Sequence, residues 1–370
     1  MQPNSDLNTI ASTVATGGPN APERRITLNQ LVNLCIEKEA SDIHFREGGK
    51  LALRVGGKIV FIENIDKLSR DEAKGMMDEL LPDPEERRRF STLREIDFSY
   101  THSNGVNFRV NLFTQKGKLA GVMRMISKHV PTLEELGVPE NIKKFLNLRE
   151  GLIVVSGPAG SGKSTTIQSM LRFINENSVR HVLTIENPIE YVFEDNKSMF
   201  TQRELGKDTL TMSSALHSAL REDVNIVVVS EIINQEALDS ILKLVETGHL
   251  VIASMLTRDA TQTLERMVSF YPPDLQKLAK DRLASSLEAI ISQDLVQRID
   301  QPGLIAVFEV MSMTPSIHNI VRRGNFVQLR TAMQAATGEG MITLDNYAYH
   351  LAERGIISQA DLNEYIQREE

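Results

Sequence analysis

The sequence has one cysteine, Cys35, and no tryptophan among its 370 residues. A single thiol cannot form an internal disulfide or build a zinc site from several thiolates. A chain without disulfides is typical of a reducing compartment, so we expect a cytoplasmic protein. Long apolar runs are missing too, because no stretch reaches the roughly 18 apolar residues that a membrane-spanning helix needs. Any attachment to a membrane is therefore expected to be peripheral.

Basic residues are also in deficit, with 41 Lys and Arg against 49 Asp and Glu and a formal net charge of −8. Nucleic-acid-binding proteins generally carry a basic excess, so we expect no nucleic-acid partner. Hydrophobic residues make up 41% of the chain and charged residues 24%, as in an ordinary globular protein. At about 150 residues per domain, the length allows about two domains with their own cores.

The first third of the chain changes character at residue 26. Residues 1–25 are rich in Asn, Ser, Thr, Gly and Pro and lack the basic start and apolar core of a secretory signal, so they are predicted to be a flexible tail. Residues 26–128 show strand-like alternation around a helical pattern at 70–81, which predicts a small α+β domain. Thr132 and Glu135 then have the spacing of a helix-capping box.

The remainder is predicted to be an α/β core. Residues 129–300 contain short β-branched apolar runs, such as those at 151–157 and 225–231, separated by helical stretches. Such runs are typical of a parallel sheet that is covered on both faces. Residues 301–370 are predicted to form a strand and a helical end, whose last two helices meet at Gly355.

A phosphate-binding motif is the strongest single signal. The sequence GPAGSGKS at 157–164 fits G-x-x-x-x-G-K-[ST] at every fixed position, after a strand-like run and before a helical pattern. Glycines let backbone amides close around phosphate oxygens at the positive end of a helix. Lys163 would supply charge to the β- and γ-phosphates, and Ser164 a hydroxyl to Mg²⁺. The alternative, a glycine-rich turn without a ligand, is disfavoured by these flanks. The predicted loop residues are Gly157, Pro158, Ala159, Gly160, Ser161, Gly162, Lys163 and Ser164.

Two glutamates follow predicted strands, Glu186 after HVLTI and Glu231 after NIVVVS. Because the carboxyl ends of parallel strands meet at the ligand crevice, both carboxylates are expected to point toward the phosphates. One could hold the water shell of Mg²⁺ while the other orients or deprotonates an attacking water. A single glutamate after a strand is more often a solvated loop residue, but a pair beside a phosphate loop favours function. His249 alone would be assigned a structural role.

The order of these motifs resembles the secretion-type ATPases of type II secretion and type IV pili, and most of all the pilus retraction (twitching motility) ATPases, the PilT family. The resemblance runs from about residue 27 to 365. It implies a RecA-like P-loop NTPase core, an N-terminal PAS-like α+β domain and a ring of six subunits that binds ATP. The segments that carry it are ASDIHF, FRVNLF, GVMRMIS, GPAGSGKSTT, TIENPIEY, ALREDVNIVVVSEI, ETGHLVIAS, SLEAIISQDL and TPSIHNIVRRG.

The resemblance also implies roles for single residues. Glu186 falls on the acidic-box glutamate, the family's general base, and Glu231 on the Walker B glutamate beside Mg²⁺. His249 falls on the first histidine of the His box. The resemblance also implies that several arginines contact the nucleotide, although for any one of them a salt bridge to an acidic residue is an equal alternative. The implied catalytic residues are Glu186, Glu231, Lys163 and His249. The implied nucleotide contacts beyond the loop are Thr165, Arg109, Arg124, Arg203 and Arg221. The implied metal ligands are Ser164 and Glu231, through water.

Several positions depart from the family pattern. Asn187 replaces an Asp, Asn225 lies where Asp-Pro-Asp is usual, Ile233 and Asn234 replace an Arg-Asp pair, Leu256 replaces the second histidine, and His318 replaces an Arg. Loss of outer-shell polar groups commonly lowers activity by about one or two orders of magnitude. The sequence therefore predicts a slow member of the family.

Taken with these departures, the sequence predicts a Mg²⁺-dependent motor that uses ATP, releases ADP and retracts type IV pili. The expected partners are copies of itself in a homo-hexamer, a pilus platform protein of the inner membrane and, as a further candidate, a paralogous retraction ATPase. One alternative is an accessory ring subunit that binds nucleotide but hydrolyses it weakly. An assembly or secretion ATPase is disfavoured because its four-cysteine zinc module is missing, and a DNA motor because the chain is acidic.

Overall fold

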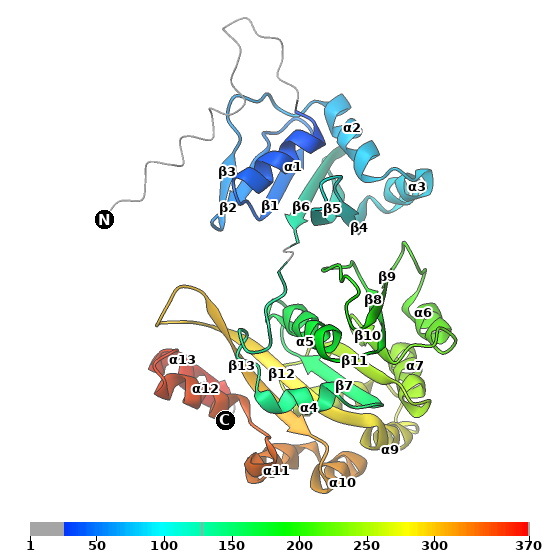
Figure 1. The fold of residues 1–370 in the computed structure, drawn as a ribbon, viewed down its shortest axis with the longest axis vertical. Coiled ribbons are helices and arrows are strands. Elements are labelled where there is room, and N and C mark those ends of the chain that lie inside the picture. Colours follow the sequence, from blue (N-terminus) through cyan, green and yellow to red (C-terminus); the bar gives the residue numbers. More distant parts are fainter. Residues whose placement is uncertain (1–25, 127–128, 369–370) are drawn as a thin grey trace, which may run out of the picture. The chain divides into compact units, whose positions relative to one another are not determined.

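A computed structural model describes residues 26–126 and 129–368, so the tail predicted at 1–25 lies outside the described residues. The chain divides into two compact units (Figure 1). The first comprises Met1–Lys128 and Asn187–Val192, and the second comprises His129–Glu186 and Phe193–Glu370. Among the described residues, no helix has the length and apolar character needed to cross a membrane.

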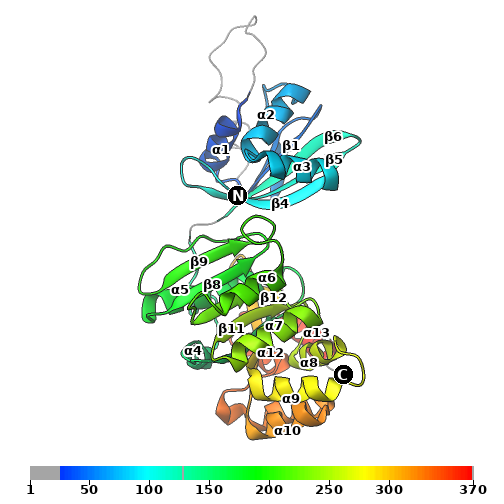
Figure 2. The ribbon, with the colours of Figure 1, turned by 90° about the vertical axis from the view of Figure 1, so that its right-hand side faces the viewer.

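The first unit is a six-stranded antiparallel sheet in the strand order β3-β2-β1-β6-β5-β4. Its helices lie on one face of the sheet (Figure 2). Its helices are α1 (Leu28–Glu37), α2 (Arg70–Leu80) and α3 (Pro84–Leu93), and its strands are β1 (Asp42–Arg46), β2 (Ala52–Val55), β3 (Lys58–Phe61), β4 (Glu95–Thr101), β5 (Asn107–Gln115) and β6 (Lys118–Met125). Alternate strand residues such as Ile43, Val110 and Met123 are wholly buried against the helices. This alternation explains the strand pattern of the sequence.

One helix of this unit was not predicted. The helical pattern at 70–81 corresponds to α2, but a second helix, α3, begins almost at once after it. The Asp83 side chain accepts a hydrogen bond from the Glu85 amide, and Pro84 occupies the first helical position. Aspartate before proline is a helix-start signal that the sequence carried. The predicted helix does end before Pro82, and α3 is a separate helix that was overlooked.

The outer face of this sheet carries a row of charges. Arg54, Asp42, Arg124 and Arg109 lie directly opposite one another on four adjacent strands. The Asp42 carboxylate is buried, with its oxygens 2.8 Å from Arg124 Nε and 3.3 Å from Arg54 Nε. Burial alone would raise the pKa of Asp42, but hydrogen bonds from Ser41 and Arg124 and the charges of both arginines lower it below its ordinary value.

The second unit is built on a seven-stranded sheet in the order β13-β12-β7-β11-β10-β8-β9, parallel except for β13. Its strands are β7 (Gly151–Ser156), β8 (His181–Glu186), β9 (Met199–Glu204), β10 (Ile226–Val229), β11 (Leu250–Met255), β12 (Leu287–Gln297) and β13 (Leu304–Ser312). Its helices are α4 (Lys143–Leu146), α5 (Lys163–Asn177), α6 (Met212–Ala219), α7 (Gln235–Glu246), α8 (Ala260–Ser269), α9 (Gln276–Ser286), α10 (Pro315–Arg323), α11 (Leu329–Ala335), α12 (Leu344–Glu353) and α13 (Gln359–Arg368).

Both faces of this sheet are covered. Helices α4 and α5 pack on Ile153 and Val155, whereas α6 to α11 enclose the core that includes Leu152 and Val154. The predicted α/β class is thereby confirmed. Strand β9 was not predicted, because it lies at the edge of the sheet and its sequence MFTQRE is half polar.

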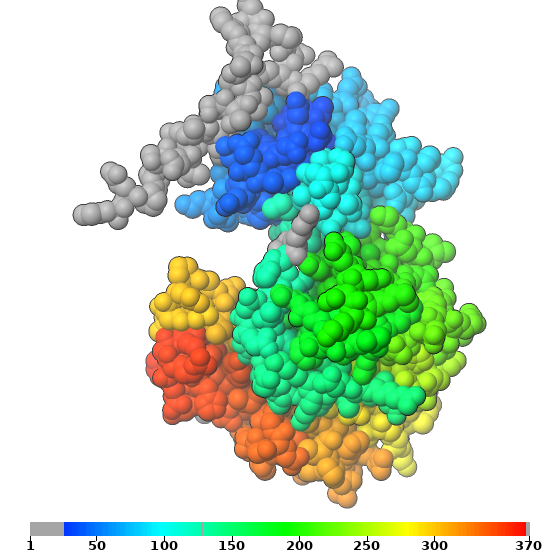
Figure 3. Space-filling model, viewed as in Figure 1, coloured from blue at the N-terminus to red at the C-terminus, as the bar shows by residue number. Residues whose placement is uncertain are grey.

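The C-terminal strand belongs to the same sheet, since β13 pairs with β12 along its whole length. Helices α12 and α13 pack on the β12–β13 hairpin through Val307, Leu344 and Leu351, and Figure 3 shows the red C-terminal helices against the yellow hairpin. The two predicted terminal helices are present, and Gly355 between them has the left-handed φ of 67° that glycine tolerates best.

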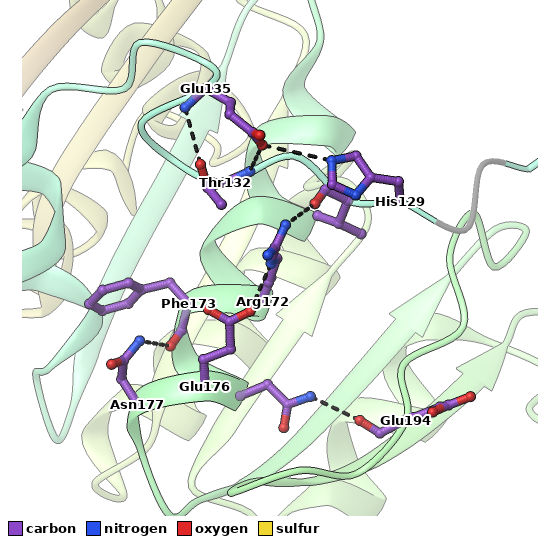
Figure 4. A network of polar contacts seen from close by, with 10 residues as sticks. His129, Thr132, Glu135, Arg172, Phe173, Glu176, Asn177 and Glu194 are labelled. Atoms are coloured by element: carbon purple, nitrogen blue, oxygen red, sulfur yellow. Dashed lines mark hydrogen bonds and ion pairs between the residues drawn. The ribbon is translucent and has the colours of Figure 1, made fainter.

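The segment that enters the second unit is tied to helix α5 (Figure 4). Arg172 donates to the carbonyl oxygen of Val130 at 2.5 Å and to Glu176 at 2.8 Å. The expected bonds between Thr132 and Glu135 form in both directions, at 2.7 and 3.1 Å. Only a turn follows them, however, so the capping-box geometry exists here without the helix that the pattern predicted.

The charged row on the first unit predicts an acid-dependent stability. Folding lowers the pKa of Asp42, so the charged carboxylate adds to the free energy of unfolding. This contribution is complete above the unfolded-state pKa of about 3.9, and it is lost as the pH falls through the folded-state pKa. Asp42→Asn should cost about 1–3 kcal/mol at pH 7. Denaturant unfolding at several pH values measures this cost.

The difference between wild type and Asp42→Asn should shrink below about pH 4, where the wild-type carboxyl also becomes neutral. Asp97→Asn, at an exposed position of the same sheet, is the matched control and should change little. A difference for Asp42→Asn that stays constant down to pH 2 would contradict the account.

Candidate nucleotide site

The phosphate-loop motif connects strand β7 to helix α5. All six residues of β7 are buried, and α5 begins at Lys163 directly after Gly162, whose φ is 87°. No side chain caps the first turn of this helix. The first amides of a helix have no partner within it, and the helix dipole makes this end positive. The structure thus presents an uncapped helix N-terminus at the end of a rigid central strand.

Close packing against strand β12 fixes the shape of the loop. A Cβ atom added to Gly157, whose φ is 154°, would lie 2.3 Å from the backbone oxygen of Gln293 and 2.4 Å from Ser161 Oγ. A Cβ on Gly160, with φ of 80°, would meet no atom within 4 Å. Position 157 therefore requires glycine because no space is left for a side chain. Position 160 has space for one, and only its positive φ favours glycine. The loop is thus a cradle that lies directly against β12, with no space for a side chain between the two at Gly157.

Lys163 lies folded over this cradle. Its Nζ donates to the carbonyl oxygens of Gly157 and Pro158, each at 2.8 Å. Burial lowers the pKa of Lys163, and the negative charge of Glu231 raises it by a smaller amount. The positive charge is thus held over the loop, in contact with neutral carbonyls that a phosphate could replace.

The two predicted carboxylates lie at the same edge of the sheet as the loop. Glu231 follows β10 and Glu186 ends β8, and both strands run parallel to β7. Glu186 accepts hydrogen bonds from Thr184 Oγ1 at 2.6 Å and from Gln202 Nε2 at 3.2 Å. These donors hold the Glu186 carboxylate in one orientation. The structure brings Lys163 and Glu231 together, with Glu186 on the next strand beyond β10.

A magnesium ion fits the oxygen atoms at this edge. Ser164 is exposed on the first turn of α5, and Glu231 is half-buried near Lys163. Within residues 26–126 and 129–368, no group of three or more His, Cys, Asp or Glu residues could hold a metal by itself. Mg²⁺ usually binds through one or two side chains together with phosphate oxygens and water, and Ser164 and Glu231 are side chains of the kind that it uses.

His249 and Arg221 lie elsewhere. Because Leu250 pairs with Gly151, His249 lies where β7 begins, six strand residues or roughly 20 Å from the phosphate loop. Its Nδ1 is 2.9 Å from the carbonyl oxygen of Leu244, so His249 fastens the turn after α7. Arg221 is exposed in the turn that leads into the start of β10. The structure does not bring either side chain to the loop of the same chain.

The other predicted arginines have acidic partners. Arg203 on β9 binds Glu222 at 3.0 Å, and Arg109 of the first unit binds Glu190 at 3.2 Å. Arg124 binds Asp42, as described above. Each of these pairs is the salt bridge that the sequence analysis gave as the equal alternative to a phosphate contact.

A row of buried polar side chains crosses three strands next to the phosphate loop, and it was not predicted from the sequence. Ser156, Ser292 and Glu309 lie side by side on β7, β12 and β13. Ser156 donates to Ser292 at 2.9 Å, Ser292 donates to Glu309 at 3.2 Å, and Glu309 accepts the Ala260 amide at 2.7 Å. The signal was available, because small polar residues interrupt strands that are otherwise apolar. The row links the end of β7 to the start of helix α8.

The contrast between two glycines predicts unequal effects of substitution. Gly157→Ala should weaken the binding of a fluorescent ADP analogue at least about 30-fold, because the loop must move to relieve the clash with β12. Gly160→Ala is the matched control, and its backbone strain of about 1 kcal/mol should cost at most about fivefold. Titration of both proteins, with thermal melting beside it, checks this. Equal losses would show that space at Gly157 does not fix the loop.

Comparison with known proteins gives concordant matches. Residues 20–343 match the family described as "Type II/IV secretion system protein". The chain is 37% identical to the type IV pilus retraction ATPase PilT of Pseudomonas aeruginosa, over 91% of this chain and 97% of that protein. It is 36% identical to a twitching motility protein of Neisseria gonorrhoeae, over 83% of this chain and 81% of that protein.

Solved structures agree with the sequence matches. A crystal structure of the pilus retraction motor PilT with bound ADP has a TM-score of 0.85 and 33% sequence identity to this chain. The match covers 92% of this chain and 97% of that one. The structural match therefore extends over both units of this chain. The chain therefore belongs to the type II/IV secretion system protein family, within its PilT group of ATPases.

Proposed function

We propose that this chain is a Mg²⁺-dependent ATP hydrolase that works as a homo-hexameric ring and drives the retraction of type IV pili. The observation that carries the proposal is the complete phosphate-loop motif, folded between β7 and α5 with Lys163 near Glu231. Similarity to a pilus retraction ATPase, over nearly the full length of both proteins, supports pilus retraction as the work that hydrolysis drives.

Binding of the nucleotide is assigned to the loop and its flanks. The backbone amides of Ala159, Gly160 and Gly162 and the first turn of α5, including Thr165, would surround the phosphates. Pro158 has no N–H, and the amides of Gly157 and Ser161 donate to the carbonyl oxygens of Met255 and Pro158. Lys163 would exchange its two carbonyl contacts for β- and γ-phosphate oxygens, a stronger charge-assisted bond. Ser164 and Glu231 would hold Mg²⁺, which supplies positive charge to the phosphates.

Hydrolysis is assigned to Glu186 as the general base. The Glu186 carboxylate would take a proton from water as the water oxygen bonds to the γ-phosphorus. The bond from phosphorus to the bridging oxygen then breaks, and ADP leaves with the electron pair. Hydrogen bonds from Thr184 and Gln202 hold the carboxylate in place before the reaction.

Arginines would stabilise charge that develops on the transferred phosphoryl group. We assign this role to Arg109, Arg124, Arg203 and Arg221, since a guanidinium keeps its charge and offers a fixed fork of donors. Arg109, Arg124 and Arg203 each form a salt bridge with an acidic residue. To bind a phosphate, each of these arginines would have to leave its acidic partner. His249 and Arg221, far from the loop of their own chain, could reach only a nucleotide that a neighbouring copy binds.

We place this chain peripherally at the cytoplasmic face of the inner membrane, where a retraction motor would act on a platform protein of the pilus. Its similarity to a pilus retraction ATPase supports this setting. A paralogous retraction ATPase is a further candidate partner for a slow enzyme.

A second candidate function is an accessory ring subunit that binds nucleotide but hydrolyses it slowly. Ile233 and Leu256 favour it, because both are more than half exposed after the carboxyl ends of β10 and β11, beside the proposed site. The family has polar residues at these two positions. An apolar side chain there cannot orient water or phosphate.

Steady-state hydrolysis separates the two functions. The wild-type chain should hydrolyse ATP, and Lys163→Ala and Glu231→Gln should each lower kcat by at least about 100-fold. Leu256→His should raise kcat by up to about tenfold if the missing polar group limits turnover. A wild-type rate equal to that of Glu231→Gln, in an intact ring, would reject the motor and leave the accessory subunit.

A further inference from the structure

Gln293 is a buried amide that has no role in the proposed mechanism. It lies on β12 opposite Phe308, and its side chain is 1% exposed. Burying an amide without hydrogen bonds costs free energy, so its contacts need an explanation. Its Oε1 has no hydrogen-bond partner among the described residues. Any hydrogen bond that this side chain makes within the described residues must therefore come from its nitrogen.

The nitrogen of this amide binds the phosphate loop. Gln293 Nε2 donates to the carbonyl oxygen of Ser161 at 2.6 Å. The backbone oxygen of Gln293 lies where Gly157 would carry a side chain, and Nε2 lies 3.1 Å from a Cβ placed on Gly162. One residue of β12 thus binds the loop at Ser161 and fills the space where side chains at Gly157 and Gly162 would lie.

This contact sets the direction of an amide in the loop. In a trans peptide, the C=O of one residue and the N–H of the next point in opposite directions. Because Gln293 draws the Ser161 carbonyl toward β12, the Gly162 N–H is turned to the other side of the loop. Gly162 directly precedes α5, whose first turn has no side-chain cap. The turned N–H therefore joins the donors available to an anion at this helix end.

We propose that Gln293 is a positioning residue that presets the phosphate loop for a nucleoside diphosphate. The inference rests on the proposed function, since it concerns the same nucleotide. Gln293 does not touch the nucleotide. It acts by holding the Ser161–Gly162 peptide in its binding orientation before the ligand arrives, so that binding does not have to order the loop. Without it, the loop samples orientations in which the Gly162 amide faces away.

Gln293→Met tests the proposal, because it keeps the length of the side chain and removes the donor. The affinity of the full chain for a fluorescent ADP analogue should fall about tenfold, which corresponds to about 1.4 kcal/mol. In ATP hydrolysis, most of the loss in kcat/KM should appear as a higher KM. Gln297→Met is the matched control, since Gln297 lies on the same strand but donates to Gly303 at the far hairpin. It should change neither affinity nor KM.

Gln293→Asn provides a milder variant in case Gln293→Met does not fold. Its amide is one methylene shorter, so it remains polar but cannot keep the 2.6 Å bond to Ser161. Hydrogen exchange of residues 157–163 without nucleotide should be faster in either variant and unchanged in the Gln297 control. This measurement reports on the loop itself and not on the ligand.

The outcomes separate this inference from the proposed function. Wild-type protein that binds no ADP would overturn the proposed function, and this inference with it. Wild-type binding that Gln293→Met or Gln293→Asn leaves unchanged would overturn the inference alone. An equal fall in kcat and affinity, or an equal effect of Gln297→Met, would assign Gln293 to general stability and would also overturn it.

Discussion

Strand β12 leaves no room for a side chain at Gly157, and the shape of the phosphate loop depends on that contact. The loop is held between the end of β7, the start of α5 and the backbone of Gln293. The position of β12 depends in turn on its pairing with β7 and β13. A register shift of one residue would turn Ser292 and Glu309 to the other face of the sheet. The candidate site is therefore a property of three paired strands rather than of the loop sequence alone.

The acidic character of the chain coexists with local positive charge. The net charge is −8, yet Lys163 lies over the loop and Asp42 is flanked by two arginines. Cys35, the single thiol, is fully buried, and burial together with the charge of Asp42 raises its pKa to about 11. A protonated, buried thiol is inert.

Sequence patterns predicted the parts of the structure that follow from local chemistry. The loop motif, the apolar strands and the helix at 70–81 were foreseeable, because their signals lie within single segments. Strand β9 was missed because an edge strand need not be apolar, and α3 because the helix-start signal of Asp83 and Pro84 was overlooked. The position of His249 was foreseeable, because it precedes its strand and the sequence predicted a parallel sheet, which puts it at the edge opposite the loop. Gln293 and Glu309 belong to the candidate site only through strand pairing, which no local pattern contains.

The central claim is that the phosphate site of this chain powers pilus retraction. The most direct measurement is the number of surface pili on cells that lack the gene, complemented with wild-type protein or with Lys163→Ala. The account predicts excess pili without twitching motility in the deletion strain, restored by the wild type and not by Lys163→Ala. An unchanged number of pili in the deletion strain, or full rescue by Lys163→Ala, would contradict it.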